Sequence, residues 1–178
     1  MKKIAIIILG ILLFYGCNLT NTPTSVVEKY LDDYISLNDN VLENMEMTIL
    51  DENLSSENRD IYKEVLSRQY ENLKYEIKDE SINGEDASVL VKISVYDLYK
   101  SMNDSTTYMN ENYDEFVDDN NMFNQDMFTE YQLNNMLIAN DIVEYEITFN
   151  LAKKDGNWVL KEPNRETLEK IHGLYNYD

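Results

Sequence analysis

Residues 143–162 read VEYEITFNLAKKDGNWVLKE, and their pattern decides the fold class. Polar or charged residues separate a row of apolar ones at Val143, Tyr145, Ile147, Phe149 and Leu151. This period of two predicts a strand with one buried face and one solvated face. The Asp155-Gly156 pair that follows predicts a two-residue hairpin turn, so Leu151 should pair with Leu160 and Lys153 with Trp158. Trp158 should then lie on the apolar face of the sheet.

A second hairpin is predicted over residues 73–96. Apolar residues again alternate with polar ones, at Leu73, Tyr75 and Ile77 and, after an NGED segment, at Val89, Val91, Ile93 and Val95. For both strands to bury the same face, Ile77 must pair with Val91 and Tyr75 with Ile93. A two-residue turn at Asn83-Gly84 would slip this pairing by one residue. We therefore expect a three-residue loop or a β-bulge in this hairpin.

Helical patterns precede the hairpins. Ser25 and Glu28 match a capping box, and apolar residues follow at helical spacing as far as Ile35. Another helix should begin near Ser56 and direct Val65 and its apolar neighbours inward. Both helices should pack on the apolar face of the sheet.

Residues 101–141 lie between the two hairpins and hold five of the 8 methionines. Their apolar spacing predicts two short helices with a polar joint at residues 118–121. Long segments held by a rigid scaffold are often functional, so we expect a helical lid across one end of the sheet. Flexible thioethers suit adaptable contact surfaces, although filling gaps in a core is the more frequent role. The candidate binding surface comprises Met122, Phe123, Met127, Phe128 and Tyr131.

Helices and antiparallel strands that occur in separate runs are typical of the α+β class. We expect a curved antiparallel sheet of about four strands packed on N-terminal helices, with a helical insertion between two hairpins. After Pro163, a short helix should begin at Asn164 and end at Gly173. Residues 25–178 should form a single α+β domain, and the insertion should span residues 101–141.

The start of the chain is typical of a secreted lipoprotein. A basic Met1-Lys2-Lys3 start precedes an uncharged apolar run over residues 4–15, which is too short to span a bilayer and matches a signal peptide. Gly16 then precedes Cys17, the one cysteine of the chain, and this junction resembles the lipobox of bacterial lipoproteins. We expect a signal peptide over residues 1–16, lipidation of Cys17 and a tether over residues 17–24. The alternative is an uncleaved anchor with an incidental cysteine.

The charge of the chain limits its partners. It has 15 basic and 34 acidic residues and a formal net charge of −19, which becomes −21 when Lys2 and Lys3 leave with the signal peptide. Such a surface repels phosphate backbones, so we expect no nucleic acid as a partner. It favours cationic peptides as partners or simply keeps the domain soluble. We expect a monomer.

Three stretches carry a resemblance to a known family: TPTSVVEKYLDDY from residue 22, ASVLVKISVYD from residue 87, and VEYEITFNLAKKDGNWVLKE from residue 143. The chain resembles the cystatin-like lipoproteins of bacteria, within the nuclear transport factor 2-like cone superfamily. The resemblance implies a cone tethered to a membrane. Some members of the superfamily are isomerases or dehydratases with a carboxylate or histidine base in the cone.

No residue pattern identifies a catalytic base, a metal site or a cofactor. The one histidine, His172, precedes the helix-ending Gly173 and is interpreted as a C-terminal charge favoured by the helix dipole. The DDNNMFNQD stretch lacks the ligand spacing of an EF-hand and is interpreted as a structural loop. The abundant tyrosines stand mostly at core spacing, although Tyr also suits interfaces.

The leading hypothesis is a non-catalytic binding or accessory module on the outer face of the bacterial cell membrane. Lipid on Cys17 would hold it there, and its partner would be a protein or a peptide. The alternative is a cone-type enzyme, an isomerase or dehydratase, with an unidentified Asp or Glu base in the cavity.

Overall fold

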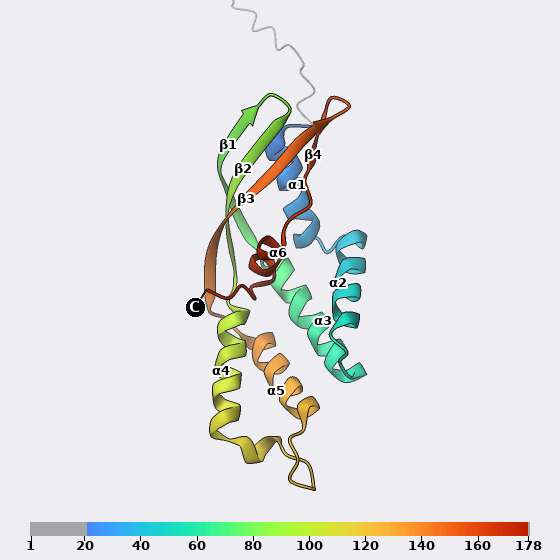
Figure 1. Cartoon of the computed structure of the whole chain (residues 1–178), viewed down its shortest axis with the longest axis vertical. Coiled ribbons are helices and arrows are strands. Elements are labelled where there is room, and N and C mark those ends of the chain that lie inside the picture. Colours follow the sequence, from blue (N-terminus) through green and yellow to red (C-terminus); the bar gives the residue numbers. More distant parts are fainter. Residues whose placement is uncertain (1–20, 178) are drawn as a thin grey trace, which may run out of the picture.

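A computed structural model describes residues 21–177, so the predictions for the signal peptide over residues 1–16 and for lipidation of Cys17 lie outside the described residues. The elements in chain order are α1 Pro23–Ile35, α2 Asp39–Asp51, α3 Ser56–Glu71, β1 Lys74–Asn83, β2 Asp86–Tyr96, α4 Leu98–Glu111, the 3-10 helix η1 Tyr113–Phe116, α5 Gln125–Ile138, β3 Ile142–Lys154, β4 Asn157–Leu160 and α6 Arg165–His172. The predicted α+β class is confirmed (Figure 1).

The four strands form one open antiparallel sheet in the order β1-β2-β3-β4. In the β3–β4 hairpin Leu151 pairs with Leu160 and Lys153 with Trp158, as predicted from the Asp155-Gly156 turn. Trp158 is buried, at 8% exposure, which confirms that it lies on the apolar face.

The predicted irregularity in the β1–β2 hairpin is a β-bulge. Ile77 pairs with Val91, but Asp79 pairs with Leu90, so one residue of β1 is left unpaired. The bulge absorbs the one-residue slip, and the hairpin can close through a two-residue turn at residues 84–85. Both conditions that the sequence set, a common apolar face and a tight turn, are thereby met.

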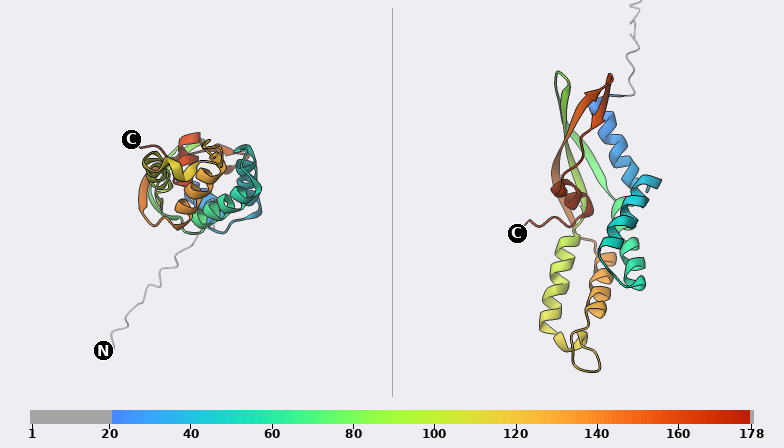
Figure 2. Two further views of the ribbon diagram at one scale, coloured as in Figure 1. Left: turned by 90° about the horizontal axis from the view of Figure 1, so that it is seen from below. Right: turned by 45° about the vertical axis from the view of Figure 1, so that its right-hand side comes forward.

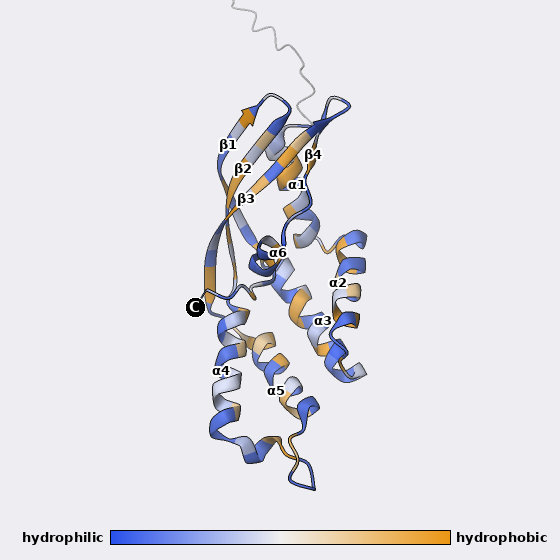
Figure 3. Cartoon of the chain, viewed as in Figure 1, coloured by the Kyte–Doolittle hydropathy of each residue, from blue (hydrophilic) through white to orange (hydrophobic). Residues whose placement is uncertain are grey.

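The core lies on one face of the sheet, beneath α1, α3 and α6 (Figures 1 and 2). Figure 3 shows apolar and polar residues alternating along β2 and β3. The inward side chains of these two strands are at most 8% exposed: Ala87, Val89, Val91, Ile93 and Val95 from β2, and Tyr145, Ile147, Phe149 and Leu151 from β3. The predicted packing of N-terminal helices on a four-stranded sheet is therefore confirmed.

The first helix begins earlier than predicted. Thr22 is its N-cap and accepts a hydrogen bond from the Ser25 N–H, while Ser25 Oγ accepts from the Thr22 N–H in return. The capping box is thus Thr22 with Ser25, not Ser25 with Glu28. Pro23 explains the shift, because its fixed φ and missing N–H suit the first helical position. The predicted tether over residues 17–24 consequently ends before Pro23.

The α4–α5 insertion forms the two predicted helices, but it is not a lid across the sheet. The helical pair extends away from one end of the sheet along the long axis of the molecule (Figures 1 and 2). Helix α5 lies beside α3, where its Leu133 and Met136 join the main core. Burial of these residues against α3 fixes the direction of the insertion, which sequence spacing alone does not encode.

Residues at the start of the described chain are attached to both hairpins. The Asn21 side chain exchanges two hydrogen bonds with the backbone of Trp158 on β4. The N–H and hydroxyl of Thr24 both donate to a Glu80 carboxylate oxygen on β1, at 2.9 and 2.7 Å. The chain therefore enters the domain at the hairpin tips, opposite the free end of α4 and α5 (Figure 1).

Candidate functional site

The predicted binding surface lies at the free end of the helical insertion. Met122 and Met127 are exposed, at 66% and 42%. Phe123 is half-buried and stacks on the exposed Tyr113, with 5.7 Å between ring centroids. These four side chains give the insertion an exposed apolar tip.

Two of the predicted surface residues belong instead to a small aromatic core. Phe128 is 8% exposed and packs edge-on against Phe116 at 5.6 Å. Tyr131 is half-buried and stacks on Tyr108 at 5.1 Å. The assignment of Phe128 to a contact surface was therefore wrong, because its ring fills the joint between η1 and α5.

The polar joint of the insertion is held by Asp118. Its Oδ1 accepts hydrogen bonds from the backbone N–H groups of Asn120 and Met122, at 2.8 and 2.9 Å. These backbone donors lower the pKa of the Asp118 carboxyl. The carboxylate thus stabilises a turn, in agreement with the interpretation of this stretch as a structural loop. Within residues 21–177 no group of three His, Cys, Asp or Glu residues is arranged to hold a metal ion.

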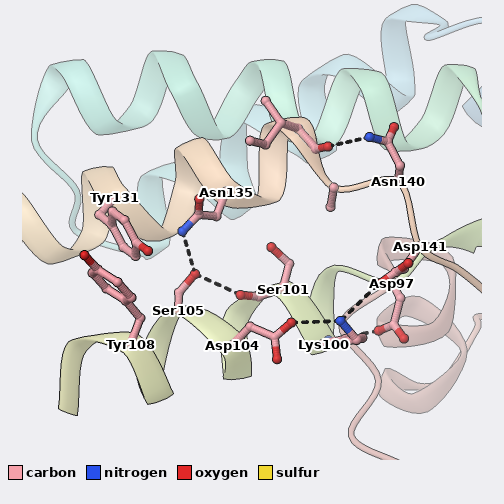
Figure 4. Close-up of a pocket in the computed structure, with 12 residues that line it drawn as sticks. Asp97, Lys100, Ser101, Asp104, Ser105, Tyr108, Tyr131, Asn135, Asn140 and Asp141 are labelled. Carbon is pink, nitrogen blue, oxygen red and sulfur yellow. Dashed lines mark hydrogen bonds and ion pairs between the residues drawn. The ribbon is translucent and has the colours of Figure 1, made fainter. Parts of the chain in front are cut away.

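A groove of about 410 Å³ runs between α4 and α5 (Figure 4). Its central cation, Lys100, lies between the carboxylates of Asp104 and Asp141, at 2.8 and 2.9 Å. These two partners raise the pKa of Lys100. The buried Asp97 caps α4 by accepting from the Lys100 N–H and also accepts from the Tyr177 hydroxyl.

Further along the same groove, the Asn135 side chain donates to the hydroxyl of Ser105, which is 2% exposed, at 3.1 Å (Figure 4). Ser105 in turn donates to the Ser101 carbonyl. The polar groups of the groove therefore bind one another and join α4 to α5. We assign the groove a structural role.

A larger cavity of about 870 Å³ lies between α1, α2 and the segment that leads into α6. Its size is near the upper end of the range for small-molecule sites. The lining residues are Tyr30, Asp33, Tyr34, Asn38, Asn40, Val41, Asn44, Met45, Met47, Thr48, Asp51, Tyr70, Glu162, Pro163, Leu168 and His172. Exposed Asn40, Asn44 and Glu162 form its rim, so the cavity opens to solvent. We call it the tyrosine cavity.

Three tyrosines form the inner wall of the tyrosine cavity. Tyr30 and Tyr34 stand one helical turn apart on α1, and their hydroxyls are 3.3 Å apart. Tyr70 of α3 meets Tyr34 edge to face at 5.0 Å. Burial is the largest cause that raises the pKa of all three phenols. They are therefore neutral hydroxyls at physiological pH.

His172 completes this wall. Its ring is half-buried and lies 5.7 Å from the ring of Tyr70. Burial lowers the pKa of His172 to about 4, and the nearby Glu169 only partly opposes this effect. The imidazole is therefore neutral at pH 7, and its interpretation as a C-terminal helix charge was wrong. Burial disfavours the charged form of the ring.

Comparison of the chain with protein families, with curated proteins and with solved structures found no match. None of the helices in residues 21–177 has the length and apolar composition needed to cross a membrane. The geometry of the tyrosine cavity is therefore the basis for assigning a function.

Sequence reasoning missed the tyrosine cavity because it missed α2, which forms one of its walls. The signal was present in the chain. Asn38 caps the helix by accepting from the Val41 N–H, and Val41, Met45 and Ile49 recur every four residues on its buried face. Had the sequence analysis predicted this helix directly after the first one, it would have placed Tyr34 between two helices.

Proposed function

We propose that this protein is a lipoprotein on the outer face of a bacterial cell membrane, where it acts as a non-catalytic binding module of the cystatin-like cone type. The Gly16-Cys17 junction after a short apolar run supports the lipid anchor. The tyrosine cavity is the observation that carries the binding function. It combines an aromatic wall, neutral hydroxyls and an open rim in one hollow.

The attachment of residues 21–24 to both hairpins supports a fixed orientation on the membrane. Only four residue steps separate Cys17 from Asn21, a reach of about 14 Å in extended chain. Lipid on Cys17 would therefore keep the hairpin tips close to the bilayer. The apolar tip at Met122 and Met127 would point away from it, and the tyrosine cavity would open to the side.

The filled core disfavours the alternative of a cone-type enzyme. The sheet face that would line a catalytic cone is covered by α1, α3 and α6. Asp97 is the buried carboxylate among the described residues, and hydrogen bonds from Lys100 N–H and Tyr177 occupy both of its oxygens. An acid–base role needs a carboxylate within reach of a substrate.

Membrane fractionation tests the anchor. Cys17→Ser should move the protein from the membrane fraction to the soluble extracytoplasmic or medium fraction, because the thioether cannot form. Ser56→Cys in the Cys17→Ser background is the matched control and should not restore membrane association. Membrane retention of Cys17→Ser would contradict the lipid anchor.

Photo-crosslinking in cells tests the binding role. A photoreactive residue at Asn44, on the rim of the tyrosine cavity, should capture a ligand or partner that mass spectrometry identifies. The same residue at Met122 samples the apolar tip, and Thr148 on the solvated face of the sheet is the control. Equal capture at Asn44, Met122 and Thr148, or capture at none of them, would contradict a binding module.

A further inference from the structure

The charges around the tyrosine cavity point to one class of ligand. The lining contains three carboxylates, Asp33, Asp51 and Glu162, and neither lysine nor arginine. Asp33 pairs with the exposed Lys29 at 2.9 Å. The side-chain carboxylates of Asp51 and Glu162 are exposed and form no ion pair within the described residues 21–177. The rim therefore carries uncompensated negative charge.

The inner wall complements that charge. The faces of aromatic rings carry negative potential and attract cations. Tyr30 and Tyr34 are half-buried and line the cavity, whereas Tyr70 is 2% exposed and supports Tyr34 by an edge-to-face contact. Their hydroxyls and the neutral imidazole of His172 add hydrogen-bonding atoms without adding positive charge. An anionic ligand would meet carboxylates on the rim and no cation inside.

We infer that the tyrosine cavity binds a small organic cation, an amine or quaternary ammonium compound with an apolar body. The apolar body would lie against Val41, Met45 and Leu168, and the cationic group would lie between the tyrosines and the rim carboxylates. This inference rests on the proposed binding function, for which it names the ligand class. It does not depend on the lipid anchor.

Three matched probes test the ligand class. Phenethylamine, 2-phenylethanol and phenylacetate share one phenyl group and differ in charge. Each would be titrated into the full-length protein in a non-ionic detergent, with the imidazole proton signal of His172 as reporter. The chain has a single histidine, so this signal reports on the cavity alone. Phenethylamine should shift the His172 signal saturably and bind at least about tenfold tighter than 2-phenylethanol. A tenfold ratio of dissociation constants corresponds to about 1.4 kcal/mol of binding free energy.

Charge variants locate the site. Asp51→Asn with Glu162→Gln should weaken phenethylamine binding about tenfold and leave the binding of 2-phenylethanol unchanged. Glu111→Gln, an exposed acid at the far end of α4, is the control and should change neither. Both carboxylates are exposed, so these variants should fold normally.

The outcomes separate this inference from the proposed function. Equal binding of the three probes, tighter binding of phenylacetate, or no shift of His172 with any of them would overturn the cation assignment. Those results would leave the crosslinking test at Asn44 untouched, since a ligand of another class could still be captured there. Loss of phenethylamine binding in the Glu111→Gln variant would likewise refute the cavity as its site.

Discussion

Gly173→Ala should be among the most destabilising single changes in this protein. Gly173 ends α6 in the left-handed conformation, with φ +70°. A Cβ built there would overlap the backbone carbonyl of Tyr96 and the side-chain amide of Gln69. Gln69 is fully buried and exchanges hydrogen bonds with Tyr96, accepting from its N–H at 3.1 Å and donating to its carbonyl at 3.2 Å. The methyl group would therefore disrupt the junction of α3, β2 and α6.

The magnitude follows from two contributions. The left-handed conformation costs an L-residue about 1–2 kcal/mol. Displacing the Gln69 amide leaves buried polar groups without partners, at about 1–3 kcal/mol each. We expect a total of about 3–5 kcal/mol, which is a large share of the stability of a single domain. Gly84→Ala is the matched control, because Gly84 has φ +64° but open space around it. The Gly84→Ala variant should lose only the stability that the left-handed conformation costs, about 1–2 kcal/mol.

Urea unfolding followed by Trp158 fluorescence measures both variants. With a slope near 2 kcal/mol per molar urea, Gly173→Ala should lower the midpoint by about 1.5–2.5 M and Gly84→Ala by about 0.5–1 M. Equal shifts for the two variants would refute the steric argument. They would mean that the Gln69 amide moves aside at no cost.

Three further predictions follow from the same structure. Tyr145→Phe should leave stability unchanged or raise it slightly in thermal unfolding, because the buried Tyr145 hydroxyl has no hydrogen-bond partner among the described residues; a loss above about 1 kcal/mol would contradict this. Burial lowers the pKa of His172 to about 4, so folding favours its neutral form. This preference should add up to about 3 kcal/mol to the free energy of unfolding above pH 6.5, and the added stability should be lost as the pH falls to 4. The difference in urea stability between wild type and His172→Gln should shrink over that window, and a constant difference would count against a buried neutral ring. Hydrogen exchange in the tip around Met122 should be faster than at Ile93 and Ile147, and equal protection would place the tip in the cooperative core.

The sequence by itself determined the features that depend on near neighbours. The alternation from Val143 to Leu151 and the Asp155-Gly156 turn gave a strand, its buried face and its register, because a two-residue turn allows only one pairing. In the first hairpin, a two-residue turn is incompatible with a common apolar face in unbroken register, so the sequence predicted either a three-residue loop or a β-bulge. The structure has the bulge, directly after Ile77. Asn164 and Gly173 marked both ends of α6, since each satisfies or redirects the backbone at a helix end.

Tertiary structure alone decided where these elements meet. Tyr34, Tyr70 and His172 are far apart in the chain and become one wall only when α1, α3 and α6 pack on the same sheet face. That packing also sets the charge state of His172, because burial of the ring, not its position in the sequence, lowers its pKa. The burial of Phe128 is likewise decided by tertiary packing, here against Phe116. Periodicity identifies which residues are buried, but it does not specify which other residues they pack against.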